Sequence, residues 1–555
     1  MKKLTRSSFL FCLILSYFPA FSQAYTHADS IRGTYGNSRN WWDVLKYDLH
    51  VKFNIDDSTI SGYNIITLKV LSKGKLLQID LQEPMTIDSM QYSIGDEPKN
   101  NIGKKDIVKD GNAYFIPSNL FSVPHTNYPV VNISVYYHGK PRIAKNAPWD
   151  GGLIWKKDQN KSPWVSIACQ GLGASVWYPC KDHQFDEPDS AALNITCPDT
   201  LMAVGNGRFR GKTLNDDHTA TYSWAVVSPI NNYNIIPYIG KYVHFGEVYN
   251  GENGPLDMDY WVLDYNLEKA KKQFTDAPRM MKAFEYWFGP YPFYKDGFKL
   301  VEAPHLGMEH QSAVAYGNGY KNGYLGRDLS ASGWGLKWDF IIVHESGHEW
   351  FANNVTTKDL ADMWVHEGFT SYSETLFTEY YYGKEAGTAY ISGLRKNIKN
   401  DIPVIAAYGV NAEGSGDMYY KGSNMLHTIR QVINNDSLFR KILHGLNSTF
   451  YHKTVTSKQV EDYISKESKI DFSKVFDQYL RTTQIPMLEY KIDGNNLKYR
   501  YKDIVKGLKM PVKINYKGGR WIKPTEQWQT LNLSQEGDNQ FSVDPNFYII
   551  TKKLD

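Results

Sequence analysis

The sequence has few cysteines, almost no net charge and only one long apolar run in its 555 residues. Lys plus Arg number 62 against 59 Asp plus Glu, and no basic run lies beyond the first residues, which argues against nucleic acid as the main partner. Beyond the N-terminus no segment approaches the ~20 apolar residues of a spanning helix, so no stable membrane span is expected.

Cysteine is scarce, with four residues in the whole chain. Cys12 lies in the N-terminal apolar run, which leaves three, an odd number: Cys169, Cys180 and Cys197. Their spacing does not form a zinc ligand set, so a structural role is predicted. Two alternatives are open: one disulfide with a free thiol, or no disulfide.

The N-terminus has the layout of a secretory signal peptide. Basic residues precede an apolar run at 9–21, and small residues follow at Ala20, Ser22 and Ala24. Residues 1–24 are therefore predicted to be a signal peptide, cleaved near 22–24, with the protein secreted to the periplasm or out of the cell. A retained membrane anchor is the alternative, disfavoured because the run is short and Pro19 interrupts it.

The rest of the chain changes character twice, which predicts a multidomain α+β protein. Residues 25–250 show mostly period-two alternation rich in β-branched and aromatic residues, which predicts an all-β domain. Residues 251–485 are mainly helical, and residues 486–555 return to strand patterns that suggest a small β-sandwich. The clearest helical patterns lie at 267–288, 335–352, 364–382, 421–434 and 457–467.

The abundance of aromatic residues has two interpretations. The chain holds 40 Tyr and 15 Trp, and such rings line surfaces that bind sugars or peptides, but half-buried strands use them too. The strand interpretation is favoured. A carbohydrate-associated enzyme would need paired carboxylates, and the sequence does not place such a pair.

One motif carries recognisable chemistry, the sequence His-Glu-Ser-Gly-His at residues 344–348. On a helix, His344 and His348 lie on one face, so both imidazoles reach a single metal. Glu345 is rotated by about 100° from His344, beside the metal but not bonded to it. A general base for water belongs at that position, as in zinc peptidases.

A third protein ligand is needed, because a catalytic zinc usually has three. Glu367 lies 19 positions after His348, in the first turn of the helix predicted at 364–382, and is the predicted third ligand. His366 is the competing choice but points about 100° away on that helix. Glu374 returns to the face of Glu367, as a candidate acceptor for the N–H of a ligand imidazole, or as a solvated surface side chain.

With Glu367, the motif resembles the M1 family of zinc aminopeptidases, of the gluzincin type. The resemblance covers about residues 42–555. Other segments agree with it: Trp287–Pro292 before the catalytic core, Gly307-Met308-Glu309 in the exopeptidase motif, Tyr419-Tyr420-Lys421-Gly422, and Gln170 ahead of Tyr178-Pro179-Cys180. The resemblance implies a thermolysin-like catalytic domain with one zinc ion per chain.

The resemblance also implies roles for single residues. Glu345 acts as general base for a zinc-activated water, and Tyr419 stabilises the oxyanion. Glu309 binds the free α-amino group of a peptide, with Gln170 as a second acceptor. The backbone at Gly307 and Met308 runs beside the substrate as an edge strand. The implied substrates are peptides with a free N-terminus, and a homo-oligomer is left open.

The sequence departs from the family pattern in three places. Leu306 stands where the family has Gly, and His310 where it has Asn, which puts the shape of the first side-chain pocket in doubt. Many members add a large helical C-terminal domain; a short form without it is expected to have a more open cleft. The alternatives are a zinc endopeptidase, a lipid-epoxide hydrolase on the same scaffold, or a catalytically silent peptide-binding member.

Overall fold

A computed structural model describes residues 24–95, 97–121, 129–516, 519–533 and 541–555. Apart from Ala24, the predicted signal peptide at 1–24 lies outside the described residues. Among these residues, no helix is both long and apolar enough to cross a membrane. Cys169, Cys180 and Cys197 are buried and form no disulfide within the described part of the chain.

The N-terminal part of the described chain is built of sheets, preceded by the short helix α1 (His27–Gly33). The largest sheet has the order β13-β14-β11-β1-β2-β8-β4-β5, in which β1 pairs in parallel with β11. Alternate residues of β1 are buried, as its period-two pattern predicts. Its strands are β1 (Trp42–Asn54), β2 (Thr59–Val70), β4 (Thr86–Ile94), β5 (Asn100–Ile102), β8 (Val130–Gly139), β11 (Ser190–Pro198), β13 (Arg208–Leu214) and β14 (Thr219–Val226).

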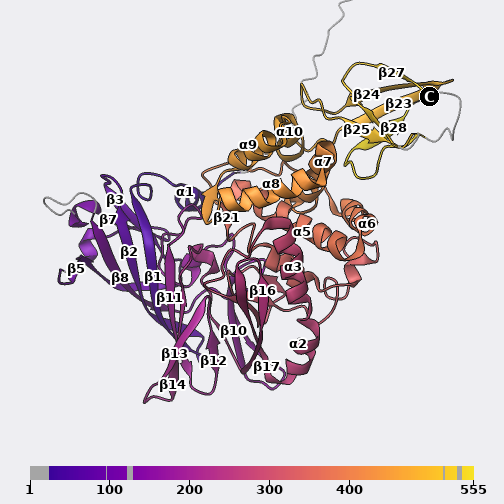
Figure 1. Ribbon diagram of the computed structural model, residues 1–555. Helices are drawn as coiled ribbons and strands as arrows, with labels where there is room; N and C mark the ends of the chain where they lie inside the picture. The colour runs from indigo at the N-terminus through magenta and orange to yellow at the C-terminus, as the bar shows by residue number, and fades with distance from the viewer. Residues whose placement is uncertain (1–23, 96, 122–128, 517–518, 534–540) are drawn as a thin grey trace, which may run out of the picture.

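Two smaller sheets complete this part (Figure 1). One has the order β3-β7-β6, and the other the order β12-β15-β10-β9. Their strands are β3 (Leu76–Asp80), β6 (Val108–Asp110), β7 (Ala113–Pro117), β9 (Gly152–Lys157), β10 (Pro163–Ala168), β12 (Met202–Val204) and β15 (Tyr238–Gly240).

The central part joins a five-stranded sheet to a group of helices. The sheet has the order β16-β17-β18-β20-β19, so β19 is an edge strand. Its strands are β16 (Tyr242–Gly251), β17 (Gly254–Leu263), β18 (Phe298–Glu302), β19 (Gly307–Met308) and β20 (Val314–Tyr316), and a parallel pair adds β21 (Val355–Thr357) and β22 (Lys453–Val455). The predicted boundary at 250/251 falls inside the β16–β17 hairpin.

The helices of this part follow the predicted order. They are α2 (Leu267–Gln273), α3 (Asp276–Phe288), α4 (Phe340–Gly347), α5 (Trp364–Tyr382), α6 (Lys384–Leu394), α7 (Tyr420–Ile433), α8 (Asp436–Thr449), α9 (Ser457–Ser468) and α10 (Ser473–Arg481). The pattern at 364–382 gives α5 directly. The pattern at 267–288 forms two helices, because the backbone leaves the α conformation at Phe274, which is the C-cap of α2.

The helix predicted at 335–352 is much shorter in the structure. It begins after Asp339, whose carboxylate accepts hydrogen bonds from the N–H groups of Ile341 and Ile342 and so caps the first turn. Beyond Gly347 the chain tightens into turns, in which the N–H groups of Glu349 and Trp350 reach back three residues. His344 therefore lies on α4, and His348 directly follows it.

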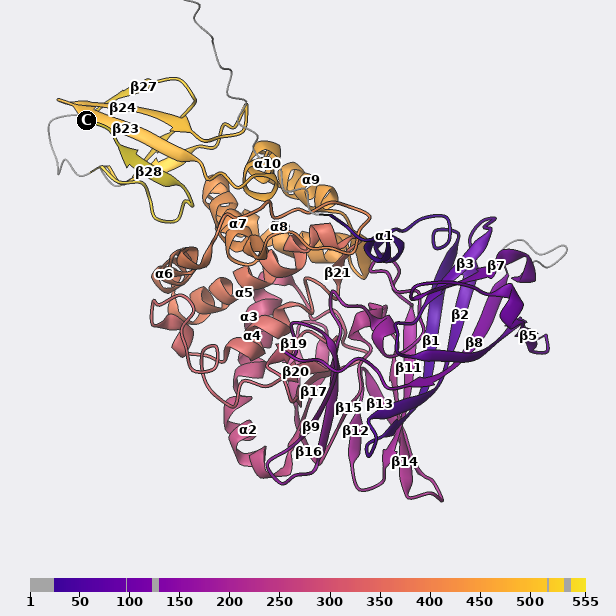
Figure 2. The same cartoon turned by 180° about the vertical axis from the view of Figure 1, so that it is seen from behind.

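The C-terminal part forms a four-stranded sheet, β27-β24-β23-β28, with a separate hairpin, β25-β26. Its strands are β23 (Met487–Asp493), β24 (Asn496–Lys502), β25 (Val512–Ile514), β26 (Arg520–Ile522), β27 (Gln529–Asn532) and β28 (Ile550–Lys553). Figures 1 and 2 show this part beyond α7 and α10, away from the N-terminal strands. The predicted mixed α+β class is confirmed.

Candidate metal centre and active site

Three side chains predicted as metal ligands converge in the structure. One ligand atom each from His344, His348 and Glu367 lies within 4.8 Å of the others, and all three residues are buried. Oε2 of Glu367 lies 3.4 Å from Nε2 of His348 and 3.8 Å from Nε2 of His344. This carboxylate oxygen is buried and has no hydrogen-bond partner among the residues that the structure describes. Two imidazoles with a carboxylate are a donor set that suits zinc.

Both imidazoles are oriented by bonds from their other ring nitrogen. Nδ1 of His344 donates to Oε1 of Glu374 at 2.7 Å, and Nδ1 of His348 donates to the carbonyl oxygen of Phe351 at 3.1 Å. These bonds place the ring proton on Nδ1 and leave the Nε2 lone pairs facing the shared space. Glu374 is only 1% exposed and its other oxygen accepts from Tyr390, so it is not a solvated surface side chain.

The competing ligand His366 points elsewhere. Its Nε2 accepts a hydrogen bond from the backbone N–H of Thr357 at 2.9 Å, so this nitrogen is engaged with β21. A second group of close carboxylate and imidazole atoms consists of Glu309, Glu345 and His348. It shares His348 with the first group, so both groups belong to one acidic site.

Glu345 lies beside the ligand set at the edge strand β19. Burial raises the pKa of Glu345 to about 7, despite the opposing charges of the two histidines. A carboxyl group with such a pKa exchanges protons near neutral pH, as a general base requires. A Cβ at Gly307 would lie 2.6 Å from Oε1 of Glu345, so only glycine allows this approach.

Glu309 forms a second polar centre in the same cleft. Its Oε1 accepts hydrogen bonds from Nε2 of Gln170 at 2.6 Å and from the hydroxyl of Tyr233 at 2.9 Å. Burial raises the pKa of Glu309, which is 2% exposed. Tyr233 was not predicted, because it lies 76 residues from Glu309 in a short 3-10 turn, Asn232–Asn234, and no motif marks it.

Tyr419 faces the ligand set from the start of α7. Its ring centre lies 6.2 Å from that of His344, with the two rings nearly parallel. Burial, and then the charge of Glu367, raises the pKa of Tyr419 well above its usual value. The phenol therefore keeps its proton at neutral pH and is available as a donor.

One cleft contains most of these groups. It holds nine of the ten predicted site residues, all except Glu374, and four that were not predicted. The full lining is Pro148, Trp149, Gln170, Gly307, Met308, Glu309, His344, Glu345, His348, Glu367, Glu413, Met418 and Tyr419. Glu413 adds a further carboxylate, whose pKa burial raises to about 7. Neither departure from the family pattern lines the cleft: the ring of His310 bonds to the hydroxyl of Tyr238, and Leu306 packs against the helical core.

Comparisons with known proteins agree with this arrangement. Residues 273–479 match the model of the peptidase family M1 domain. Leukotriene A-4 hydrolase of Xenopus laevis is 22% identical over 441 residues, 74% of this chain and 69% of its own length. Leucine aminopeptidase 2 of Vanderwaltozyma polyspora is 23% identical over 462 residues, 80% of this chain, but the chain spans only 63% of that protein.

Solved structures share the fold. The M1 zinc metallopeptidase of Deinococcus radiodurans, in a mutant form bound to a Tyr-Ser-Ala substrate, aligns with a TM-score of 0.63 at 18% identity. The alignment covers 80% of this chain and 95% of that one. A mutant two-domain M1 zinc metallopeptidase bound to L-arginine gives a TM-score of 0.61, with 77% and 91% covered. Residues 273–479 thus match the peptidase family M1 domain, and the chain shares its fold with these M1 zinc metallopeptidases.

Proposed function

We propose that the protein is a zinc aminopeptidase that removes the N-terminal residue from peptides. The observation that carries this proposal is the buried carboxylate of Glu309, which lies in the same cleft as the ligand set and, among the described residues, accepts side-chain hydrogen bonds from two neutral groups, Gln170 and Tyr233. A buried carboxylate without a cationic partner favours a cation, and a peptide's α-ammonium group is the cation that an exopeptidase must bind.

The residues fit a zinc ion. His344, His348 and Glu367 would hold it, and Glu374 would fix the ring of His344. Zinc, when bound, supplies Lewis-acid chemistry: it polarises the scissile carbonyl and makes a water more acidic. A single ion per chain is proposed, because the second group of ligand atoms shares His348 with the first.

The protein's own residues carry the remaining steps. Glu309 holds the α-ammonium group, which places the first peptide bond beside Glu345. Glu345 takes a proton from the attacking water and passes it to the leaving amine, as a general base beside the ligand set can do. Tyr419 donates its hydroxyl hydrogen to the carbonyl oxygen as negative charge develops there. The edge strand β19 lies alongside and can pair with the peptide backbone.

The relatives support this proposal without establishing it. Three of the four proteins compared are named as peptidases, and one of these structures was solved with a tripeptide. The match to an enzyme named leukotriene A-4 hydrolase keeps a lipid hydrolase as a second candidate, and an endopeptidase is a third. Glu309 distinguishes them, because only an aminopeptidase needs a free α-amino group.

A panel of aminoacyl fluorogenic substrates, each with and without an N-acetyl cap, tests the proposal. We expect hydrolysis of the free-amine series alone, loss of activity with a zinc chelator, and recovery on adding zinc. Equal hydrolysis of the capped series would favour an endopeptidase, and no chelator-sensitive activity on any free-amine substrate would refute the proposal.

We also propose that the protein is secreted, on the basis of its N-terminal sequence. The basic start, the apolar run at 9–21 and the small residues after it are typical of a cleaved signal. N-terminal sequencing of the mature protein should give a start near residues 23–25. A mature protein that keeps its first ten residues would contradict this proposal.

A further inference from the structure

The segment that follows the predicted signal peptide, residues 25–40, lies where the N-terminal sheets meet the catalytic helices. Figures 1 and 2 both place α1 between the N-terminal strands and β21. The segment contacts two loops, and each loop carries a residue of the cleft. One loop, residues 169–184, carries Gln170; the other, residues 408–413, carries Glu413.

Two hydrogen bonds hold α1 against the second loop. The N–H of Asn411 donates to the carbonyl oxygen of Asp29 at 3.0 Å. The hydroxyl of Thr34 donates to the carbonyl oxygen of Gly409 at 3.1 Å. The side chain of Asn411 continues the chain of contacts, because its Nδ2 donates to the carbonyl oxygen of Gly171 at 3.3 Å, next to Gln170.

Arg32 fastens α1 to the first loop directly. Its Nε lies 3.4 Å from Oδ2 of Asp182, and the side chains are 21% and 4% exposed. The same Oδ2 accepts from the hydroxyl of Ser175 at 2.5 Å. A Cβ at Gly173 would lie 2.1 Å from both Nη2 of Arg32 and Oδ2 of Asp182, so the loop backbone passes directly over this ion pair.

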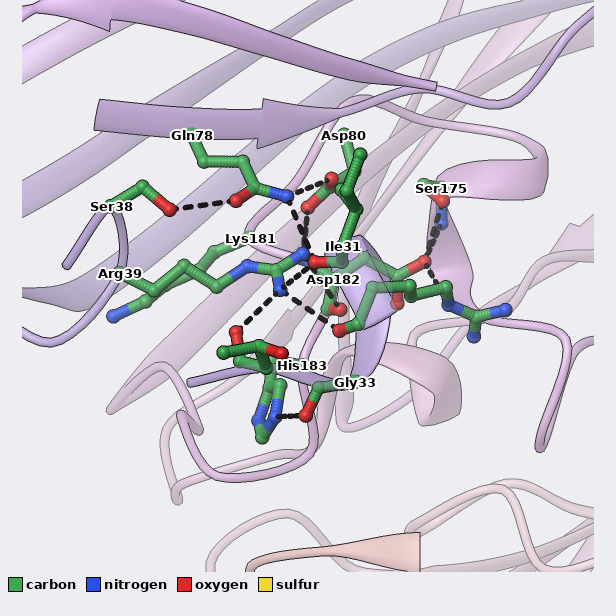
Figure 3. A network of polar contacts seen from close by, with 12 residues as sticks. Ile31, Gly33, Ser38, Arg39, Gln78, Asp80, Ser175, Lys181, Asp182 and His183 are labelled. Carbon is green, nitrogen blue, oxygen red and sulfur yellow. Dashed lines mark hydrogen bonds and ion pairs between the residues drawn. The ribbon is translucent and has the colours of Figure 1, made fainter. Parts of the chain in front are cut away.

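A buried arginine holds α1 in place (Figure 3). Nη1 of Arg39 donates to the carbonyl oxygens of Ile31, Arg32 and Thr34 at 2.9–3.1 Å, which satisfies the C-terminal end of the helix. Nη2 of Arg39 donates to Asp80 of β3 at 2.6 Å. Arg39 therefore links α1 to the N-terminal sheets, in addition to the contacts of α1 with the two loops.

The first loop leads to the proposed amine-binding pair, Gln170 and Glu309. Gly171 and Gly173 both have positive φ, 67° and 98°, and lie outside any strand, so this segment is held by its own turn hydrogen bonds and by contacts from neighbouring segments. Gln82 holds Leu172 from the β-domain side, at 2.8 Å. Arg32 and Asn411 hold the loop from the side of α1, and Gln170 at its start donates to Glu309.

We propose that α1 is a positioning element for the amine-binding pair Gln170–Glu309, and that Arg32 and Asn411 are its positioning residues. The inference rests on the proposed aminopeptidase function. Neither residue lines the cleft; each sets the place of Gln170, which together with Tyr233 orients the Glu309 carboxylate. Loss of either should weaken amine binding and leave the metal centre and the chemical step intact.

The test compares Arg32→Ala and Asn411→Ala with Arg500→Ala. Arg500 forms a similar ion pair with Glu489, with side chains 25% and 11% exposed, in the C-terminal sheet far from the cleft. Arg32→Ala should raise KM for leucyl-p-nitroanilide about tenfold, since small misplacements at a reacting site are costly, with kcat within about twofold. Asn411→Ala should act in the same direction, and Arg32→Lys should restore part of the loss.

Inhibition by two small molecules distinguishes a positioning role from a merely structural role. Free L-leucine, which needs the amine site, should inhibit Arg32→Ala about tenfold less well than wild type, whereas acetohydroxamate, which needs only the metal, should inhibit both equally. Unchanged KM and leucine inhibition in both Arg32→Ala and Asn411→Ala would overturn the inference, as would an equal change in Arg500→Ala. A wild-type protein that is inactive on every free-amine substrate would refute the proposed function itself.

Discussion

Replacement of Glu309 by glutamine isolates the charge that the proposed function requires. Oε1 of Glu309 accepts from Gln170 and Tyr233, and the carbonyl oxygen of a glutamine at this position accepts the same two bonds. The side chain keeps its volume and stays buried, so packing changes little. What is lost is the negative charge facing the α-ammonium group.

The magnitude follows from the nature of the lost bond. A hydrogen bond to a charged group contributes about 1.5–3 kcal/mol, and the ammonium group loses this contribution when its ionic partner becomes neutral. At 1.36 kcal/mol per factor of ten, Glu309→Gln should reduce kcat/KM about 10- to 150-fold on aminoacyl substrates. Any residual activity on N-acetylated substrates should not fall, because these have no ammonium group to bind.

The assay measures kcat/KM of wild type and Glu309→Gln on matched free and N-acetylated leucyl substrates. Zinc content and melting temperature serve as controls, since Glu309 lies close to His348. Unchanged kcat/KM on the free-amine substrate, at equal zinc content, would refute the assignment of Glu309 to amine binding. An equal loss on both substrates would instead place Glu309 in the chemical step.

Three further changes have definite expected outcomes. Tyr419→Phe should lower kcat about 100- to 1,000-fold with little change in KM, as expected for a lost oxyanion donor, and equal kcat would contradict that role. Glu374→Gln should weaken zinc binding about 10- to 100-fold in chelator competition, because His344 loses its ionic partner; unchanged affinity would assign Glu374 to packing alone. Burial, followed by the charge of Arg39, lowers the pKa of His183 to about 3, below its unfolded value of about 6.5. The unfolded state therefore binds this proton first, so the melting temperature should fall more steeply from pH 6.5 to 4.5 in wild type than in His183→Gln, and parallel curves would contradict this.

The sequence predicts the ligand set because its spacing is local. His344 and His348 belong to one helical motif, and the pattern at 364–382 matches α5, which carries Glu367. Periodicity did not predict where α4 begins, because the capping bonds of Asp339 decide it. Such a cap depends on one side chain, and the apolar pattern is the same before and after it, so the pattern does not mark the start of the helix.

The proposed amine-binding centre is harder to predict from the sequence, because distant segments form it. Gln170 and Glu309 lie 139 residues apart, and only the family resemblance joined them. Tyr233 and Trp149 come from a short 3-10 turn and a loop, where periodicity carries no signal. Trp149 is 64% exposed at the rim of the cleft, and no sequence pattern distinguishes such an aromatic from one in a strand.

The charges of the cleft suit the proposed binding of a metal ion and a substrate amine in one site. Four carboxylates line it: Glu309, Glu345, Glu367 and Glu413. Burial raises the pKa of three of them, so without cations the cleft keeps protons that it would otherwise release. A bound zinc ion and a substrate ammonium group together supply three positive charges, which balance three of the four carboxylates and leave one to exchange a proton near neutral pH. A site that needs both cations to reach that balance holds a free-amine peptide more strongly than a capped one, and that is the preference an aminopeptidase must have.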